Sequence, residues 1–158
     1  MFAGVGNWVE QKRILIQSLR LWRERGKDYR VADALVDLSD TNRKMGLYGE
    51  GIQQVREALE IFDSLGKTGK QAHCLLVLAW ALHQDEQLDA AEDAASRAMD
   101  FLENRDQHQL CQCHLILGKI HRSKGDREKA LHHYEASLQI ASSLNSHSEL
   151  FEIGRAHV

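Results

Sequence analysis

The sequence predicts an all-α protein, an α-α superhelix in which antiparallel helix pairs stack as a solenoid. Three observations support this fold class. The 158 residues contain no proline, and helix-favouring residues dominate the chain. A pattern of apolar and small residues returns about every 40 residues. Within each repeat, apolar residues are spaced three and four positions apart, as on one face of a helix, and do not alternate as they would in a strand.

The repeat is clearest in four segments that begin at Gly6, Gly46, Glu86 and Gly125. One aligned column holds only small residues: Ser18, Ala58, Ala98 and Ser137. In the second segment, a stripe suited to one buried helix face consists of Ile52, Val55, Leu59 and Phe62. Each segment is therefore predicted to be one helix.

The chain is expected to open with an unpaired helix over residues 6–22 and to continue as three helix pairs. The second helices are expected over 46–62, 86–102 and 125–141, each preceded by a first helix around 34–42, 75–82 and 111–121. Gly125 and Asp126 suit a turn, since glycine tolerates positive φ and aspartate caps helices. A single pair cannot bury an apolar face alone, so the pairs are predicted to stack. A plain helical bundle is the alternative.

The spacing within each unit resembles that of the tetratricopeptide repeat, with the pattern aromatic-x2-Leu-Gly-x2-Tyr-x8-Ala-x3-aromatic-x2-Ala. The third unit matches it with His114, Leu117, Gly118, His121, Ala130, Tyr134 and Ser137. His114 and His121 occupy positions that usually hold buried aromatic rings. The family's usual proline is missing, and the period exceeds the common 34 residues. This long form resembles the arrays of kinesin light chain and those of fungal NACHT and NB-ARC proteins.

The resemblance leads to a prediction of domain organisation. One repeat array is expected over residues 1–151, with repeats at approximately 32–70, 72–109 and 111–149. Residues 152–158 resemble a translated sequencing adapter and are predicted to be non-native. Apolar faces are expected at both array ends, at Ile14 and Leu15 and at Leu150 and Phe151, where they would favour self-association.

Composition argues against several classes of function. The net charge of −3 lacks the basic bias of nucleic-acid binders, and no apolar run is long enough to span a bilayer. Three cysteines fit a reducing compartment, so a cytoplasmic location is predicted. The chain has no P-loop, HExxH or GxSxG motif, so neither an enzyme nor a cofactor is expected. Cys111, Cys113, His114 and His121 lack the spacing of a zinc site and are interpreted as core residues.

By resemblance, the first helix of each pair lines a concave surface that binds a protein or peptide. The predicted partner-binding residues are Asp33, Asp40, Arg43, Lys44, His73, Trp80, His83, Gln84, Gln112, Lys119 and Arg122. Trp80 is the predicted anchor, because an exposed tryptophan combines a large apolar area with a polar handle. Packing of Trp80 between neighbouring units is the other interpretation. The four basic residues of this set are expected either to attract acidic groups or to be simply solvated.

The sequence therefore predicts a protein-interaction scaffold, and more specifically the sensor region of a larger signalling protein. The alternative is a structural module that packs against itself or its parent chain and has no separate ligand.

Overall fold

The computed structural model describes residues 3–102 and 105–144. Within these ranges the chain forms seven α-helices and no strand. The helices are α1 (Ala3–Glu24), α2 (Asp28–Lys44), α3 (Tyr48–Ser64), α4 (Thr68–Gln84), α5 (Leu88–Leu102), α6 (Gln107–Ser123) and α7 (Arg127–Leu144). The predicted all-α class is confirmed, with one helix followed by three pairs.

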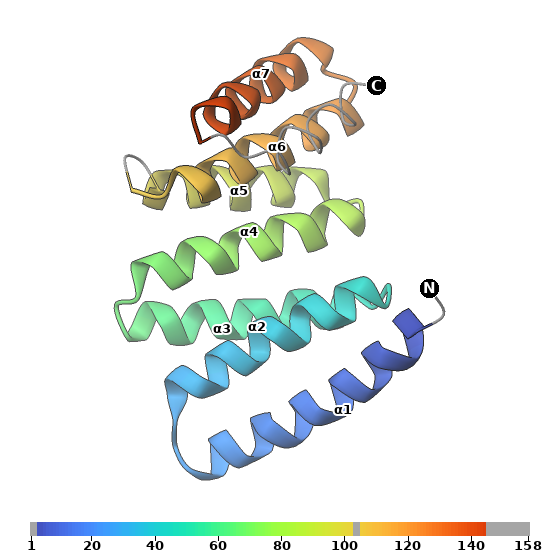
Figure 1. Ribbon diagram of the computed structural model, residues 1–158, viewed down its shortest axis with the longest axis vertical. Helices are drawn as coiled ribbons and strands as arrows, with labels where there is room; N and C mark the ends of the chain where they lie inside the picture. The colour runs from blue at the N-terminus through green and yellow to red at the C-terminus, as the bar shows by residue number, and fades with distance from the viewer. Residues whose placement is uncertain (1–2, 103–104, 145–158) are drawn as a thin grey trace.

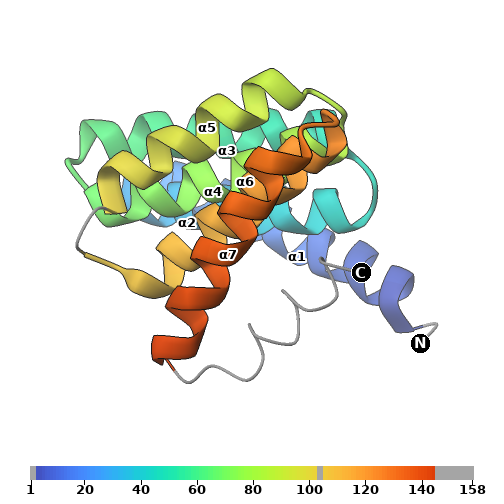
Figure 2. The same cartoon turned by 90° about the horizontal axis from the view of Figure 1, so that it is seen from above.

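The helices stack one above the other from α1 to α7, and each packs against the next in the chain (Figure 1). The connections within the pairs are short, which makes chain neighbours antiparallel. Seen from above, successive pairs are rotated relative to one another, as in a superhelix (Figure 2). The predicted stack of helix pairs is therefore present.

The turns after α1, α2, α3, α4 and α6 each contain one residue with positive φ. Gly46 has φ of 80° and Gly125 has φ of 82°, a left-handed conformation that ends a helix and reverses the chain. The backbone N–H of Leu47 donates to the carbonyl of Asn42 at 2.8 Å and closes the first of these turns. At the corresponding place after α4, Glu86 adopts φ of 63°, so a residue with a Cβ occupies a position that favours glycine.

Small residues allow the paired helices to approach closely. Ala79, Ala91 and Ala130 are buried at helix contacts. A Cβ added at Gly118 of α6 would lie only 2.5 Å from the ring of Tyr134 on α7. The larger core side chains, Phe62, Leu35, Leu75, Leu82 and Ile116, are almost completely buried around these contacts. The small side chains at these positions therefore leave room for the neighbouring helix.

The first helix, α1, is amphipathic only in part. Leu19 is buried, and Leu15 and Trp22 pack against the core. Ile14 and Leu21 remain about half exposed, at 50% and 52%. The expectation of an exposed apolar face is thus confirmed for Ile14 and wrong for Leu15. Leu150, Phe151 and the tail 152–158 lie outside the described residues.

Candidate protein-binding surface

The first helices of the three pairs, α2, α4 and α6, lie side by side on one surface. Contacts run between α2 and α4 and between α4 and α6, whereas the described parts of α3, α5 and α7 have no comparable contact with one another. Because helices approach most closely on the inside of a curved stack, this surface is the concave one. We call it the inner surface.

Side-chain contacts cross the inner surface from one pair to the next. The guanidinium of Arg43 on α2 donates to the Gln84 Oε1 atom of α4 at 3.0 Å. His83 Nε2 of α4 lies 3.1 Å from Ser123 Oγ at the end of α6. These contacts place Arg43 of α2 and the neighbouring His83 and Gln84 of α4, three residues predicted from the sequence, in one row that ends at Ser123 of α6.

Trp80 occupies the middle of the inner surface. Its side chain is half-buried and packs against core residues of both the second and the third pair. The Lys119 ammonium of α6 lies 4.9 Å from the centre of the Trp80 ring, a cation–π geometry. The ring therefore packs between two units and still presents area to solvent. Its role as a partner-binding anchor stays a prediction.

The α2 end of the inner surface carries three carboxylates, two of which pair with cations. Asp40 accepts from Arg43 at 2.8 Å and is paired with Lys44 at 3.1 Å. Burial pushes the pKa of Asp40 upward, but these two cations outweigh it and lower that pKa. One turn earlier, partial burial and the nearby Asp33 and Asp40 raise the pKa of Asp37. The basic residues predicted here are therefore matched by a carboxylate of their own helix.

Asp37 is absent from the residues predicted from the sequence, although its spacing from Asp33 and Asp40 puts all three on one helix face. No ion pair reaches Asp37 from any other residue in the part of the chain that the structure describes. The carboxylate therefore leaves unmatched negative charge on α2.

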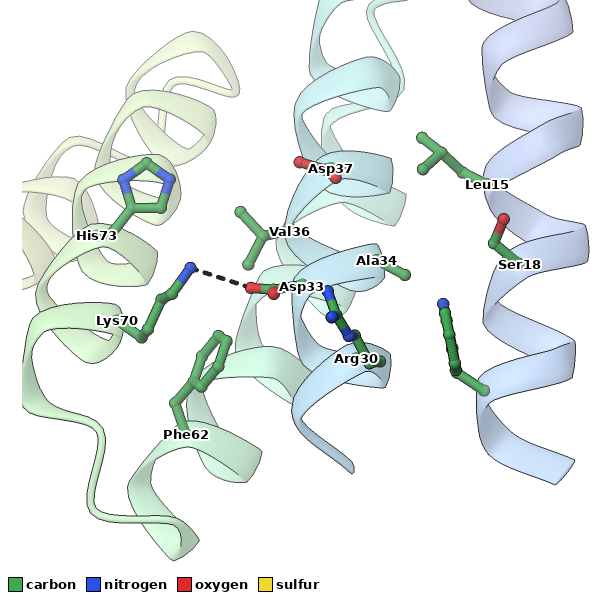
Figure 3. Close-up of a pocket in the computed structure, with 11 residues that line it drawn as sticks. Leu15, Ser18, Arg30, Asp33, Ala34, Val36, Asp37, Phe62, Lys70 and His73 are labelled. Atoms are coloured by element: carbon green, nitrogen blue, oxygen red, sulfur yellow. Dashed lines mark hydrogen bonds and ion pairs between the residues drawn. The ribbon is translucent and has the colours of Figure 1, made fainter. Parts of the chain in front are cut away.

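A cavity of about 450 Å³ opens beside this acidic row, between α1, α2 and α4 (Figure 3). Its polar wall includes Lys70, which pairs with Asp33 at 3.2 Å, and His73. Desolvation, followed by the charge of Lys70, lowers the pKa of His73. Trp22 and Phe62 supply apolar wall. Sequence reasoning predicted Asp33 and His73 here but missed Trp22 and Lys70, because the cavity forms where three helices meet.

The α6 end of the inner surface is basic. Arg122 is exposed, and Gln112 and Lys119 are half-buried. Burial raises the pKa of the Tyr134 hydroxyl, and a hydrogen bond from Arg122 partly offsets this. Gln112, Lys119 and Arg122 are spaced seven and three residues apart, so helix geometry puts them near one face of α6.

The described residues offer no reactive centre of a recognisable kind. Burial raises the pKa of the Cys74 and Cys113 thiols to about 12, which disfavours their thiolate forms. The Cys111 thiol packs 3.2 Å from Ser137 Oγ. In the described ranges no three His, Cys, Asp or Glu side chains are grouped to hold a metal ion. None of the helices within those ranges is both long and apolar enough to cross a membrane.

Comparisons with known proteins agree with this geometry. Models of the tetratricopeptide repeat match residues 30–104 and 112–144. The solved structure of BtubC (BKLC) from P. vanneervenii is similar over 90% of this chain, with a TM-score of 0.80 and 20% identity. That of MamA is similar over 94% of this chain and 85% of its own, with a TM-score of 0.65 and 17% identity.

The chain spans 59% of the BtubC chain. No curated protein matches the sequence significantly. At these identities the two solved structures show a shared fold, and the repeat models show the family. The chain belongs to the tetratricopeptide repeat family, whose repeats generally serve as scaffolds for protein–protein interaction.

Proposed function

We propose that this chain binds an extended or helical segment of another protein along its inner surface. The observation that carries the proposal is the half-buried Trp80, which lies at the centre of the row formed by α2, α4 and α6. Its ring is held by packing on both sides, so little side-chain entropy remains to be lost on binding. Preorganised aromatic residues of this kind are frequent interface hot spots.

The charges on either side of Trp80 specify the chemistry of the partner. Unmatched negative charge lies at Asp37 on α2, and basic side chains lie at Lys119 and Arg122 on α6. A segment with an apolar anchor, a basic residue toward α2 and an acidic residue toward α6 complements this surface. The sequence alone suggests a partner segment with acidic groups on both sides of its apolar anchor. In the structure, Asp40 already pairs with Arg43 and Lys44, so the α2 side does not call for an acidic group.

A more specific part of the proposal concerns biological context. The long repeat period resembles that of arrays attached to signalling ATPases, which supports a role as the sensor region of a larger protein in the cytoplasm. The complete coding sequence tests this part of the proposal. An adjoining nucleotide-binding domain supports the sensor role, and its absence removes that role while leaving groove binding intact.

Photo-crosslinking tests groove binding directly. Benzoylphenylalanine is placed at Gln84, which is exposed on the inner surface, and in a matched variant at Arg97, which is exposed on α5. The chain is then irradiated in an extract of its source organism, and the products are identified by mass spectrometry. Capture of the same protein only from Gln84 supports the proposal. Equal capture from both positions would contradict it.

The structure also favours a second candidate, a structural module without a separate ligand. Arg43, Gln84 and His83 are engaged with neighbouring pairs, so they contribute to stacking. If stacking is their sole purpose, His83→Ala will lower the unfolding midpoint, and the crosslinker at position 84 will capture no partner. If the surface binds a segment, His83→Ala will weaken capture from position 84 while the fold persists.

A further inference from the structure

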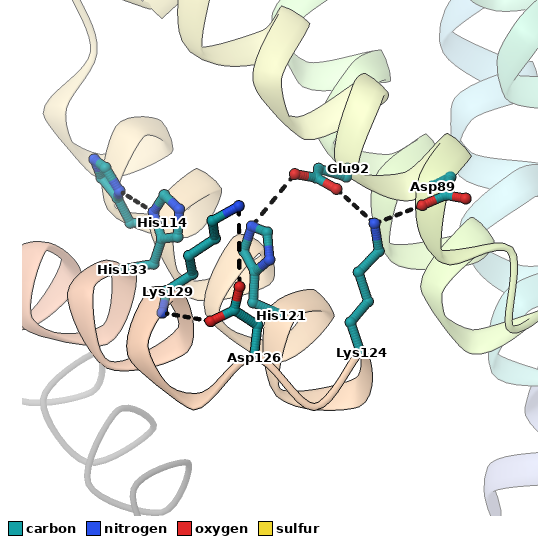
Figure 4. Close-up of polar contacts among 8 residues, drawn as sticks. All are labelled: Asp89, Glu92, His114, His121, Lys124, Asp126, Lys129 and His133. Carbon is teal, nitrogen blue, oxygen red and sulfur yellow. Dashed lines mark hydrogen bonds and ion pairs between the residues drawn. The ribbon is translucent and has the colours of Figure 1, made fainter.

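Four histidines gather where α6 packs on α7. His114 and His121 come from α6, and His132 and His133 come from α7. His133 lies at the centre: its Nδ1 atom is 3.1 Å from Nδ1 of His114, and its ring is parallel to that of His121, with centroids 5.4 Å apart (Figure 4). The ring of His132 meets it edge-on at 5.4 Å. We call these four residues the histidine cluster.

The contact between His114 and His133 has a strict proton requirement. A hydrogen bond between two Nδ1 atoms needs one N–H donor and one lone-pair acceptor. When both rings are imidazolium ions, each Nδ1 carries a hydrogen and neither can accept. Double protonation therefore replaces a hydrogen bond by repulsion between two cations.

The charged groups around the cluster add to this effect. From α5, Glu92 lies 3.4 Å from His121 Nε2, but it also pairs with Lys124 at 2.7 Å. Lys124 is shared in turn with Asp89. On the α7 side, Lys129 pairs with Asp126 in the turn. Asp89 and Glu92 share one lysine, so about one net negative charge is left near His121. Among these groups no further negative charge is left to neutralise a second imidazolium.

We propose that the histidine cluster is an acid-sensitive latch, which holds α7 on α6 at neutral pH and loosens the third helix pair when His114 and His133 are both protonated. The α6 part of the inner surface, with Lys119 and Arg122, would lose its support in acid. A partner bound along that surface would then be released. The latch itself does not require that a partner binds there.

The direction of the pH effect follows from linkage. Partial burial, then the charges of the neighbouring histidines, lowers the pKa of His133 to about 4, and burial lowers that of His114. In the unfolded chain the histidine rings have a pKa of about 6.5. Below that pH, an opened helix pair therefore binds protons that the closed pair does not. Above the unfolded pKa, the latch contributes its full free energy to keeping α7 on α6. This stabilisation is lost as the pH falls toward the folded-state pKa of His133.

Hydrogen exchange on the native chain measures the latch. Opening equilibria of amides in α6 and α7 are compared at about pH 7 and about pH 5, after correction for intrinsic exchange. The pair α2–α3 contains no histidine and serves as an internal reference. Each proton bound only by the open form favours opening by about tenfold per pH unit. Between about pH 7 and about pH 5, opening of α6–α7 should therefore increase at least about tenfold relative to α2–α3.

Two variants separate the latch from a general effect of acid. Asparagine at position 133 offers a polar atom near the place of Nδ1 but does not titrate, so His133→Asn should remove most of the acid effect. His108→Asn, in the exposed first turn of α6, should leave it unchanged. If His133→Asn does not fold, His114→Asn replaces it.

Equal opening of both helix pairs in acid would overturn the proposal, as would a full acid effect in His133→Asn. An acid effect on α6–α7 in a chain that binds no partner would count against the proposed function alone and leave the latch in place. Conversely, binding that persists at about pH 5 with α6–α7 open would show that release is not coupled to the latch.

Discussion

Replacing Gly118 by alanine tests the close approach of α6 and α7. A Cβ at this position would lie 2.5 Å from Cε1 and 2.6 Å from Cδ1 of Tyr134, well inside van der Waals contact. Tyr134 is buried, at 3% exposure, so its ring cannot swing into solvent. Either the ring or the helix must move by about 1 Å to restore ordinary contact.

The expected loss of stability follows from two opposing effects. Overpacking a rigid contact of this kind costs about 1–3 kcal/mol. Alanine favours a helix interior over glycine by about 1 kcal/mol, which offsets part of that cost. Gly118→Ala should therefore destabilise the chain by up to about 2 kcal/mol.

Urea unfolding followed by circular dichroism measures this difference. Gly69→Ala is the matched control, because Gly69 is also helical but has nothing within 4 Å of its Cβ position. The control should be neutral or stabilising, by up to about 1 kcal/mol. In a Tyr134→Leu background, which removes the ring, Gly118→Ala should lose its penalty. Equal effects of Gly118→Ala and Gly69→Ala would refute the steric argument.

Three further outcomes are expected. In urea unfolding, Glu86→Gly should stabilise the chain by about 0.5–1 kcal/mol, because glycine adopts positive φ without strain. Gly46→Ala should destabilise it by about 1 kcal/mol for the same reason. A less stable Glu86→Gly variant or a more stable Gly46→Ala variant would contradict this. Asp106→Ala removes the side chain that caps α6 and should cost about 1 kcal/mol in the same assay, whereas Lys67→Ala, where no side chain caps α4, should be neutral. Light scattering should show concentration-dependent self-association that Ile14→Lys with Leu21→Lys suppresses; a wild-type chain that stays monomeric would count against it.

The helices and their order could be predicted because local chemistry repeats. Small residues such as Gly118 and Ala130 return at the spacing of helix contacts, and glycines such as Gly46 return at the turns. The turn at Glu86 was still predictable from the period, although its own residue disfavours the conformation. The repeat period therefore predicts the turn even where Glu86 replaces the glycine that positive φ favours.

The surface could be predicted only in part. Trp80, His83 and Gln84 lie on the surface where helix spacing places them, and their binding of a partner stays a prediction. Whether a charge is free depends on which neighbour reaches it, and the sequence pattern does not reveal the pairing of Asp40 with both Arg43 and Lys44. The histidine cluster escapes sequence reasoning for a similar reason, since the register between α6 and α7 brings His114 to His133. Such contacts depend on tertiary geometry that a single sequence does not specify.

Titration of the crosslinked partner against Trp80→Ala tests the central claim most directly. Arg97→Ala, on the exposed part of α5, is the matched control, and circular dichroism confirms that each variant is folded at the assay temperature. If the inner surface is the binding site, Trp80→Ala should weaken binding by about 30-fold, the effect of losing about 2 kcal/mol at a hot spot, at low and high salt alike. Arg97→Ala should bind like the wild type. Unchanged affinity in a folded Trp80→Ala variant would show that the inner surface is not the binding site.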